Sequence, residues 1–283
     1  MTDIRPVDMP ELRSDLVGQL LHPSLLNPFL ERFRGEVEEG MDTAKGLQGL
    51  FSEMELYHAS GPMTELAWNA SLTLQAFEVQ AEDAPCRAGL MVFGGKIPKS
   101  VTMDDGCVAD LCGVVWLIDA RSLILMPVLE PMAHFKVAGQ AVVLPSAYFV
   151  TMLSGGLERP AAEYESITES DVLPLLLSAW LLMRQPLASV SEVEVDRAAR
   201  KRLRRAGQEP KPVRVVELRR PKSSGEHGDG NRDYQHQWIV RGHWRQQWHP
   251  KREVHRPVWI APHIKGPEGA PLIGGEKVYA WKR

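Results

Sequence analysis

The chain has 283 residues, of which 44% are hydrophobic and 24% are charged, values that exclude collagen, a coiled coil and a largely disordered chain. No apolar run reaches the ~18 residues of a membrane helix, and the N-terminal segment has no apolar stretch typical of a secretory signal. Three cysteines, an odd number in a long chain, favour a reducing compartment over a disulfide framework. We therefore expect a cytoplasmic globular protein.

The net charge of −3 hides two parts of opposite charge. Residues 195–283 contain 21 Lys plus Arg and 9 Asp plus Glu, a net charge of +12, which leaves a net charge of −15 for residues 1–194. A basic segment attracts polyanions, whereas an acidic segment repels them or docks on a basic surface. We expect an acidic α+β domain over 1–185 and a basic, β-rich domain over 186–283. The alternative is that the two oppositely charged parts pack on each other.

The first 82 residues predict helices. Leucines at helical spacing indicate a helix over 11–21, which Pro23 ends, and the same spacing indicates a second helix over 25–39. Residues 63–82 also favour a helix, and a strand over 72–79 is the competing interpretation.

The middle of the chain has short apolar segments separated by turn residues, a pattern typical of strands. The segments 89–93, 113–118, 122–128 and 137–144 together predict a small antiparallel sheet within 86–150. A strongly apolar helix is indicated over 171–184, with Pro174 in its first turn, where the missing N–H costs no hydrogen bond.

The basic part begins with an Ala- and Arg-rich helix over 195–206, ended by Gly207. Four strands are then indicated, over 213–219, 236–244, 256–262 and 277–282. The expected fold class is α+β: a mainly helical N-terminal part with a small antiparallel sheet, followed by a basic helix and a C-terminal antiparallel β-sheet.

Two stretches of the basic part have a distinctive sequence, WIVRGHWRQQW over 238–248 and HRPVWIAPHIKGP over 255–267. Together they form the signature HWRxQW…HRPxWIxPHxKGP. This module resembles the ends of uncharacterised proteins carried by actinobacterial genomes and their phages and plasmids, and the resemblance covers about the last 100 residues. It implies a connection with phages or other mobile elements, and it carries over no chemistry and no catalytic residue.

Basic, aromatic and amide side chains alternate in the C-terminal part of the chain. Lys and Arg neutralise phosphates, aromatic rings stack on unpaired bases, and Gln side chains read base edges. We therefore predict a surface that binds nucleic acid, single-stranded nucleic acid or structured RNA more than duplex DNA. The candidate residues are Arg200, Arg204, Arg241, His243, Arg245, Gln246, Trp248, Lys251, Arg256 and Lys265. The alternative is that the tryptophans form the core of a small sheet and the Arg and His residues its solvated face.

A catalytic role is the second hypothesis. A metal-independent ribonuclease needs one group that takes the 2′-hydroxyl proton, one that protonates the leaving oxygen and cations for the phosphorane charge. His243, His255 and His263 are candidates for the proton transfers, with neighbouring Arg and Lys as the cations. Small antiparallel-sheet ribonuclease toxins use such sets, which is an argument by analogy alone.

Neither a metal nor another cofactor is predicted. Cys107 and Cys112 lack CxxC spacing, and the C-terminal histidines lack the spacing of a helical ligand pair, so buried thiols are the favoured interpretation. The expected partners are RNA or DNA for the basic part and a protein partner or a second copy for the acidic part, with no membrane.

Overall fold

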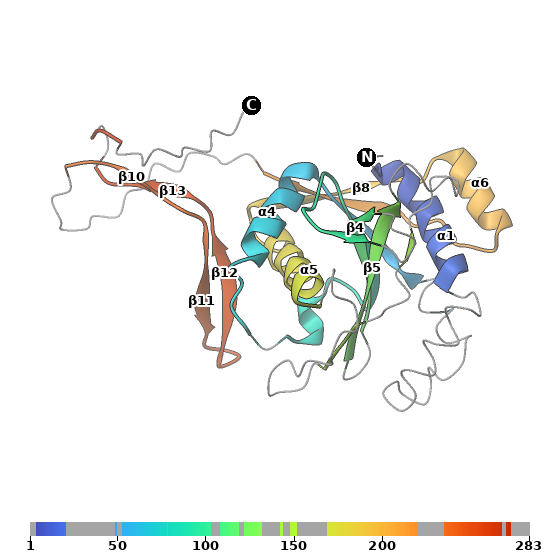
Figure 1. Ribbon diagram of the computed structural model, residues 1–283, viewed down its shortest axis with the longest axis horizontal. Helices are drawn as coiled ribbons and strands as arrows, with labels where there is room; N and C mark the ends of the chain where they lie inside the picture. The colour runs from blue at the N-terminus through green and yellow to red at the C-terminus, as the bar shows by residue number, and fades with distance from the viewer. Residues whose placement is uncertain are drawn as a thin grey trace.

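The computed structural model (Figure 1) describes residues 4–20, 49, 53–77, 79–102, 108–118, 122–131, 142–143, 148–151, 169–219, 235–267 and 270–272. Its centre is a mixed sheet with the strand order β6-β5-β4-β2-β1-β9-β8, to which β3 and β7 add through β4 and β5. These strands are β1 (Glu55–Ala59), β2 (Ala88–Phe93), β3 (Ser100–Thr102), β4 (Val108–Ile118), β5 (Ser122–Pro131), β6 (Val142–Val143), β7 (Tyr148–Thr151), β8 (Ala188–Val193) and β9 (Val213–Leu218).

Strand β1 holds the sheet together, because it pairs in parallel with β2 on one side and with β9 on the other. The remaining described pairs of this sheet are antiparallel. The parallel connection from β1 to β2 passes through helix α4 (Gly61–Ser71), as a parallel pair requires a crossover.

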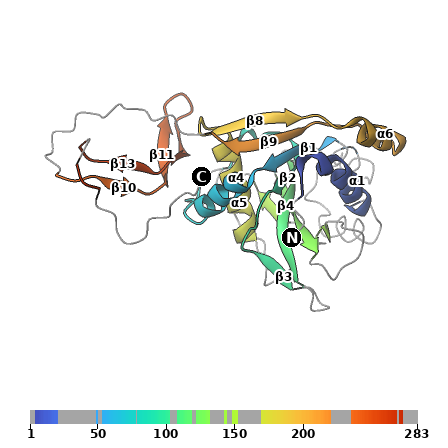
Figure 2. The same ribbon diagram turned by 90° about the horizontal axis from the view of Figure 1, so that it is seen from above.

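Helices cover both faces of the sheet (Figures 1 and 2). Helix α4 and the strongly apolar α5 (Glu169–Met183) lie on one face, and α1 (Met9–Leu20) lies on the other. Successive residues of β1 point to opposite faces, so Leu56 packs in the layer under α1 and Tyr57 in the layer under α4 and α5. In the second layer the fully buried Trp116 has its ring centroid 5.6 Å from that of Tyr57 and 5.3 Å from that of Trp180.

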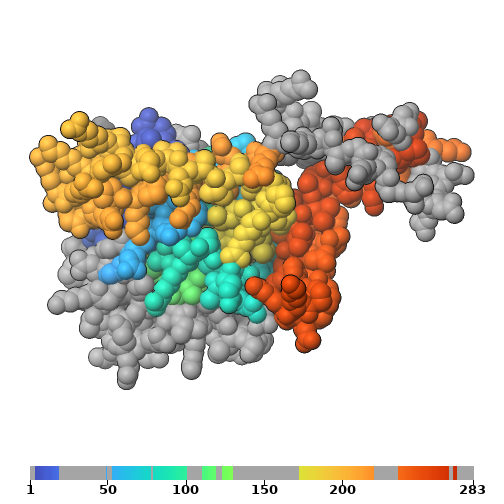
Figure 3. All heavy atoms as spheres, turned by 180° about the vertical axis from the view of Figure 1, so that it is seen from behind, coloured from blue at the N-terminus to red at the C-terminus, as the bar shows by residue number. Residues whose placement is uncertain are grey.

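A two-stranded ribbon follows the sheet in the chain (Figures 1 and 2). A bend divides each of its two chain segments into two strands: β10 (Trp238–Val240) and β11 (His243–His249) in the first, and β12 (Val254–Ile260) and β13 (His263–Lys265) in the second. Strand β10 pairs with β13 and β11 with β12, both antiparallel. The register is continuous across the bend, because Val240 is opposite His263 and His243 is opposite Ile260. Hairpin β11–β12 lies against the body, whereas β10–β13 extends beyond it (Figure 3).

The expected α+β fold class was wrong, and the finding that overturns it is the large mixed sheet with parallel β1, β2 and β9. The N-terminal part is therefore not mainly helical with a small antiparallel sheet. Strand β1 was missed because a buried parallel strand normally has a continuous apolar sequence, whereas ELYHA contains Glu55 and His58. Strand β9 was assigned to a tail sheet, but it pairs with β1, and β8 pairs with β9. Chain on both sides of residue 185 thus contributes to one sheet.

The local predictions have mixed outcomes. The helices expected over 11–21, 171–184 and 195–206 are confirmed as α1, α5 and α6 (Arg197–Arg205). Helix α4 ends at Ser71, so the helix predicted over 63–82 was too long, and 72–77 form neither helix nor strand. The long strand predicted over 236–244 is interrupted by the bend at Arg241 and Gly242. The predicted helix 25–39 and strand 277–282 lie outside the described residues.

Within the described part of the chain, no helix combines the length and the apolar character that crossing a membrane demands.

Two glycine substitutions test the packing of the sheet. A Cβ on Gly89, which is opposite Trp116 in the sheet, would lie 2.2 Å from the Trp116 ring, so Gly89→Ala is expected to destabilise the fold by about 1–3 kcal/mol. Gly18 in α1 is exposed and has nothing within 4 Å of a Cβ, so Gly18→Ala is expected to stabilise by up to about 1 kcal/mol. Urea unfolding of the two variants should give opposite shifts; an undiminished stability of Gly89→Ala would contradict the packing described.

Candidate nucleic-acid interface

Two tryptophans attach the ribbon to the body. Trp244 on β11 and Trp259 on β12 are opposite each other, are each 8% exposed and meet edge to face with 5.2 Å between ring centroids. Both belong to the same apolar cluster as α4 and α5, and the Trp244 indole N–H donates to the carbonyl oxygen of Ala70 at 2.8 Å. These rings are therefore core residues and are not available to stack on bases.

A buried ion pair supplements this attachment. Arg256 on β12 donates to Oδ2 of Asp83 at 2.8 Å, and both side chains are about nine-tenths buried. Asp83 ends the 3-10 helix Ala81–Asp83, and the same oxygen accepts from the Gln80 backbone N–H at 2.8 Å. Arg256 was predicted to contact nucleic acid, but its guanidinium is occupied by a carboxylate of the body.

The bend in the ribbon requires a glycine. A Cβ on Gly242 would lie 2.5 Å from the Trp259 ring and 3.1 Å from Pro262. The backbone at residue 242 can therefore pack against the Trp259 ring only if the residue has no side chain. Gly266 has a φ of +117°, and a Cβ there would lie 2.4 Å from the His236 carbonyl oxygen. These two contacts give a structural reason for Gly242 in the stretch over 238–248 and for Gly266 in the stretch over 255–267.

Opposite the buried rings the ribbon carries exposed basic groups. His243 and Arg245 are exposed on β11 and alternate with the buried Trp244, and Arg241 precedes them by two residues in the bend. The Arg245 guanidinium donates to Oε1 of Gln247 at 2.6 Å, and Nδ1 of His243 lies 3.0 Å from the Arg241 carbonyl oxygen. This alternation places His243 and Arg245 on one side of β11, and Arg241 precedes them in the bend.

The ribbon has a strong excess of positive charge. Residues 235–267 contain six Lys or Arg and a single acidic residue, Glu253. Lys251 lies exposed in the turn between β11 and β12, and Lys265 is exposed at the end of β13. Among the described residues, no carboxylate forms an ion pair with Arg241, Arg245, Lys251 or Lys265.

The other predicted residues are placed differently. Trp248 is 45% exposed, its ring centroid lies 4.9 Å from that of His255, and Gln246 on the same strand is half-buried. Arg200 and Arg204 lie on α6, at the opposite end of the molecule from the ribbon (Figure 2). There Arg200 pairs with Glu194 at 3.6 Å, so the structure does not bring these two arginines to the ribbon surface.

The three candidate catalytic histidines are spread along the ribbon. His255 is opposite Trp248, five residues along β11 from His243, a separation of about 17 Å at strand spacing. His263 is opposite Val240, on the other side of the bend from His243. A general acid and a general base must both reach one phosphate, so this placement does not form the pair that the ribonuclease hypothesis needs.

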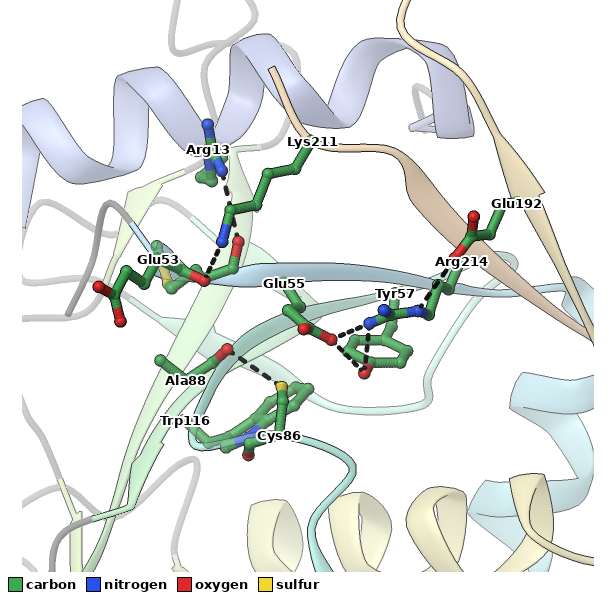
Figure 4. Close-up of polar contacts among 11 residues, drawn as sticks. Arg13, Glu53, Glu55, Tyr57, Cys86, Ala88, Trp116, Glu192, Lys211 and Arg214 are labelled. Carbon is green, nitrogen blue, oxygen red and sulfur yellow. Dashed lines mark hydrogen bonds and ion pairs between the residues drawn. The ribbon is translucent and has the colours of Figure 1, made fainter. Parts of the chain in front are cut away.

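A second polar cluster, missed by the sequence analysis, lies on the central sheet (Figure 4). Arg214 on β9 forms ion pairs with Glu55 on β1 and, at 3.5 Å, with Glu192 on β8. Its guanidinium also donates to the Tyr57 hydroxyl at 2.9 Å, and that hydroxyl donates to Glu55 at 2.9 Å. The sequence gives only a weak indication of this cluster, because its four residues, Glu55, Tyr57, Glu192 and Arg214, come from three separate segments.

The chemistry of this cluster is that of a structural network. Burial raises the pKa of Tyr57 and raises the pKa of the adjacent Cys86 thiol to about 11, so neither group ionises near neutral pH. Arg214 is shared between two carboxylates and has no charge left for a substrate. Glu55 is also the first residue of β1, whereas ligands of parallel sheets bind beyond the carboxyl ends of the strands.

The carboxyl ends of the parallel strands are closed by backbone contacts. The Ser60 N–H donates to the Val216 carbonyl at 2.9 Å, and the Gly94 N–H donates to the Ala59 carbonyl at 2.8 Å. A Cβ on Gly94 would lie 2.9 Å from that same Ala59 oxygen, so the neighbouring segments are in close contact. Backbone hydrogen bonds therefore continue the pairing of β1 with β2 and β9 just beyond the carboxyl end of β1.

In the part of the chain that the structure describes, no three His, Cys, Asp or Glu side chains are grouped closely enough to hold a metal ion. No protein-family model matches the chain, and the search of curated proteins finds no match either. The site therefore stands on its own geometry, and the ribbon is one of two exposed basic features among the described residues, the other being helix α6.

The attachment of the ribbon can be tested at the buried ion pair. Asp83→Ala leaves the Arg256 charge in a buried position without its carboxylate, so the free energy of unfolding is expected to fall by about 3–5 kcal/mol, with faster amide exchange over 243–260. Arg245→Ala removes an exposed guanidinium from the neighbouring strand and is expected to change stability by less than about 0.5 kcal/mol. Equal stability losses in the two variants would argue against the docking described.

Proposed function

We propose that this protein binds nucleic acid through the basic ribbon surface, which we define as Arg241, His243, Arg245, Lys251 and Lys265. The observation that carries the proposal is a projecting ribbon with six basic residues and one acidic residue on a chain whose first 194 residues have a net charge of −15. Phosphates are attracted to the ribbon and repelled by the acidic residues of the first 194 positions. Lys and Arg on the ribbon then displace the counterions of the nucleic acid, which supplies the binding free energy.

The spacing on β11 also suits a repeating anion. Side chains two residues apart on one side of a strand are separated by about 6.8 Å, so His243 and Arg245 form a regular pair of donors on β11, to which Arg241 adds a third cation from the bend. An arrangement of this kind follows a phosphate backbone without reading its bases. Affinity that depends on salt and little on sequence is therefore the expected behaviour.

The role of the acidic body in this proposal is to hold the ribbon and to dock a protein partner or a second copy of the chain. On the resemblance of its last 100 or so residues, the protein is further proposed to be an accessory factor of phages or other mobile elements. The separation of His243, His255 and His263 along the ribbon favours binding over ribonuclease catalysis.

The double substitution Arg241→Ala with Arg245→Ala tests the surface. Each lost phosphate contact lowers the slope of log K against log salt by about 1, so the slope is expected to fall by about 2 and the affinity to fall with it. Fluorescence anisotropy with labelled DNA and RNA oligonucleotides over a series of salt concentrations measures both quantities.

The matched control is Lys201→Ala with Arg205→Ala, which removes the same charge from exposed positions of α6. This control is expected to keep the slope of the unmodified protein, because α6 lies at the other end of the molecule (Figure 2). An unmodified protein that binds neither DNA nor RNA at low salt would sink the proposed function. So would equal losses in the ribbon and control variants, because the effect would then reflect net charge alone.

A further inference from the structure

The outer part of the ribbon exposes apolar side chains on one side. Ile239 on β10 and Ile264 on β13 are directly opposite each other, with 43% and 51% of their surface exposed. Leu272, which forms a parallel bridge to Gln237 beside β10, is 46% exposed. By strand alternation Gln237 and Ile239 share one side, and Arg241 follows Ile239 by two residues in the bend, so the apolar group is adjacent in the chain to the basic residues.

Exposed apolar side chains within a basic ribbon are best matched by a partner that is anionic and that can also bury an apolar group. Between its base pairs, duplex nucleic acid offers apolar stacked surface within a polyanionic backbone. A protein or lipid partner for the isoleucines would have to tolerate the cations that follow them along the same strand. The charge of residues 235–267, six basic against one acidic, is complementary to such a polyanion, and a nucleic acid is the occupant to which we commit.

The structure also changes which form of nucleic acid fits. The expectation of a single strand rested on aromatic rings that stack on unpaired bases. Trp244 and Trp259 are buried in the body, Trp238 is half-buried, and among the described tryptophans Trp248 alone is exposed, already in contact with His255. The shape that remains is a two-stranded ribbon, which fits a groove of duplex DNA.

We propose that the ribbon binds duplex DNA and that Ile239 and Ile264 together insert as a wedge between adjacent base pairs, unstacking them and bending the duplex. This inference rests on the proposed function and specifies its ligand. Arg241 holds the phosphates beside the wedge, with His243 and Arg245 further along the same strand. Flexible pyrimidine–purine steps such as TA are the preferred point of insertion, because they unstack most easily.

The experiment uses the full chain and a 30-base-pair duplex with 2-aminopurine at a central TA step and a donor–acceptor dye pair at its ends. Anisotropy reports binding, 2-aminopurine fluorescence reports unstacking, and energy transfer reports bending. The unmodified protein is expected to raise the 2-aminopurine signal several-fold and to shorten the distance between the ends. Ile239→Ala with Ile264→Ala is expected to bind with less than a tenfold loss of affinity and to abolish both signals.

Val190→Ala is the matched control, because Val190 on β8 is 46% exposed and belongs to the body; it is expected to leave all three signals unchanged. Salt-sensitive binding of the duplex without any unstacking or bending would overturn the wedge and leave the proposed function in place. Binding of a single strand with no binding of the duplex would overturn it in the same way. Failure to bind either form is the separate result that removes the proposed function itself.

Discussion

The ribbon depends on its attachment to the body, and that attachment is made by Trp244, Trp259 and the Arg256–Asp83 ion pair. A buried ion pair repays its desolvation only while both partners are in place, so Arg256 and Asp83 fix where β12 lies. The two indole rings add apolar burial beside α4 and α5. A two-stranded ribbon has little stability in isolation, and this contact gives it a fixed base.

The same attachment separates the ribbon into two kinds of residue. Side chains that face the body are buried and hold the ribbon in place, as Trp244 and Trp259 do. On the other side His243 and Arg245 are exposed, whereas Arg256, which is opposite Gln247 on that same side, is buried against Asp83. The period of two along β11 separates His243 and Arg245 from Trp244, and the segments of the body that pack on the ribbon decide which residues of each side are buried. Composition alone suggested that both kinds contribute to binding.

The tertiary structure also brings together residues from the acidic and the basic parts of the chain. Strand β9, from the basic part, pairs with β1, and Arg214 on β9 is held between Glu55 and Glu192. Part of the basic charge is thus neutralised inside the body by acidic residues, and Arg202 on α6 likewise pairs with Glu11 on α1 at 2.5 Å. The ribbon differs because it projects from the body, and in the described residues its cations other than Arg256 have no carboxylate partner.

What the sequence determined by itself is local. The leucine spacing of α1, the apolar run of α5 and the Ala- and Arg-rich sequence of α6 each require a helix, and the alternation in β11 requires two unlike sides. Tertiary structure alone decided the strand order, the role of β1 and the burial of Trp244 and Arg256. Those outcomes depend on contacts between distant segments: Trp244 is 174 residues from Ala70, Arg256 is 173 from Asp83, and Arg214 is 157 from Tyr57. Periodicity reports which side of an element is apolar, but not which distant segment covers it.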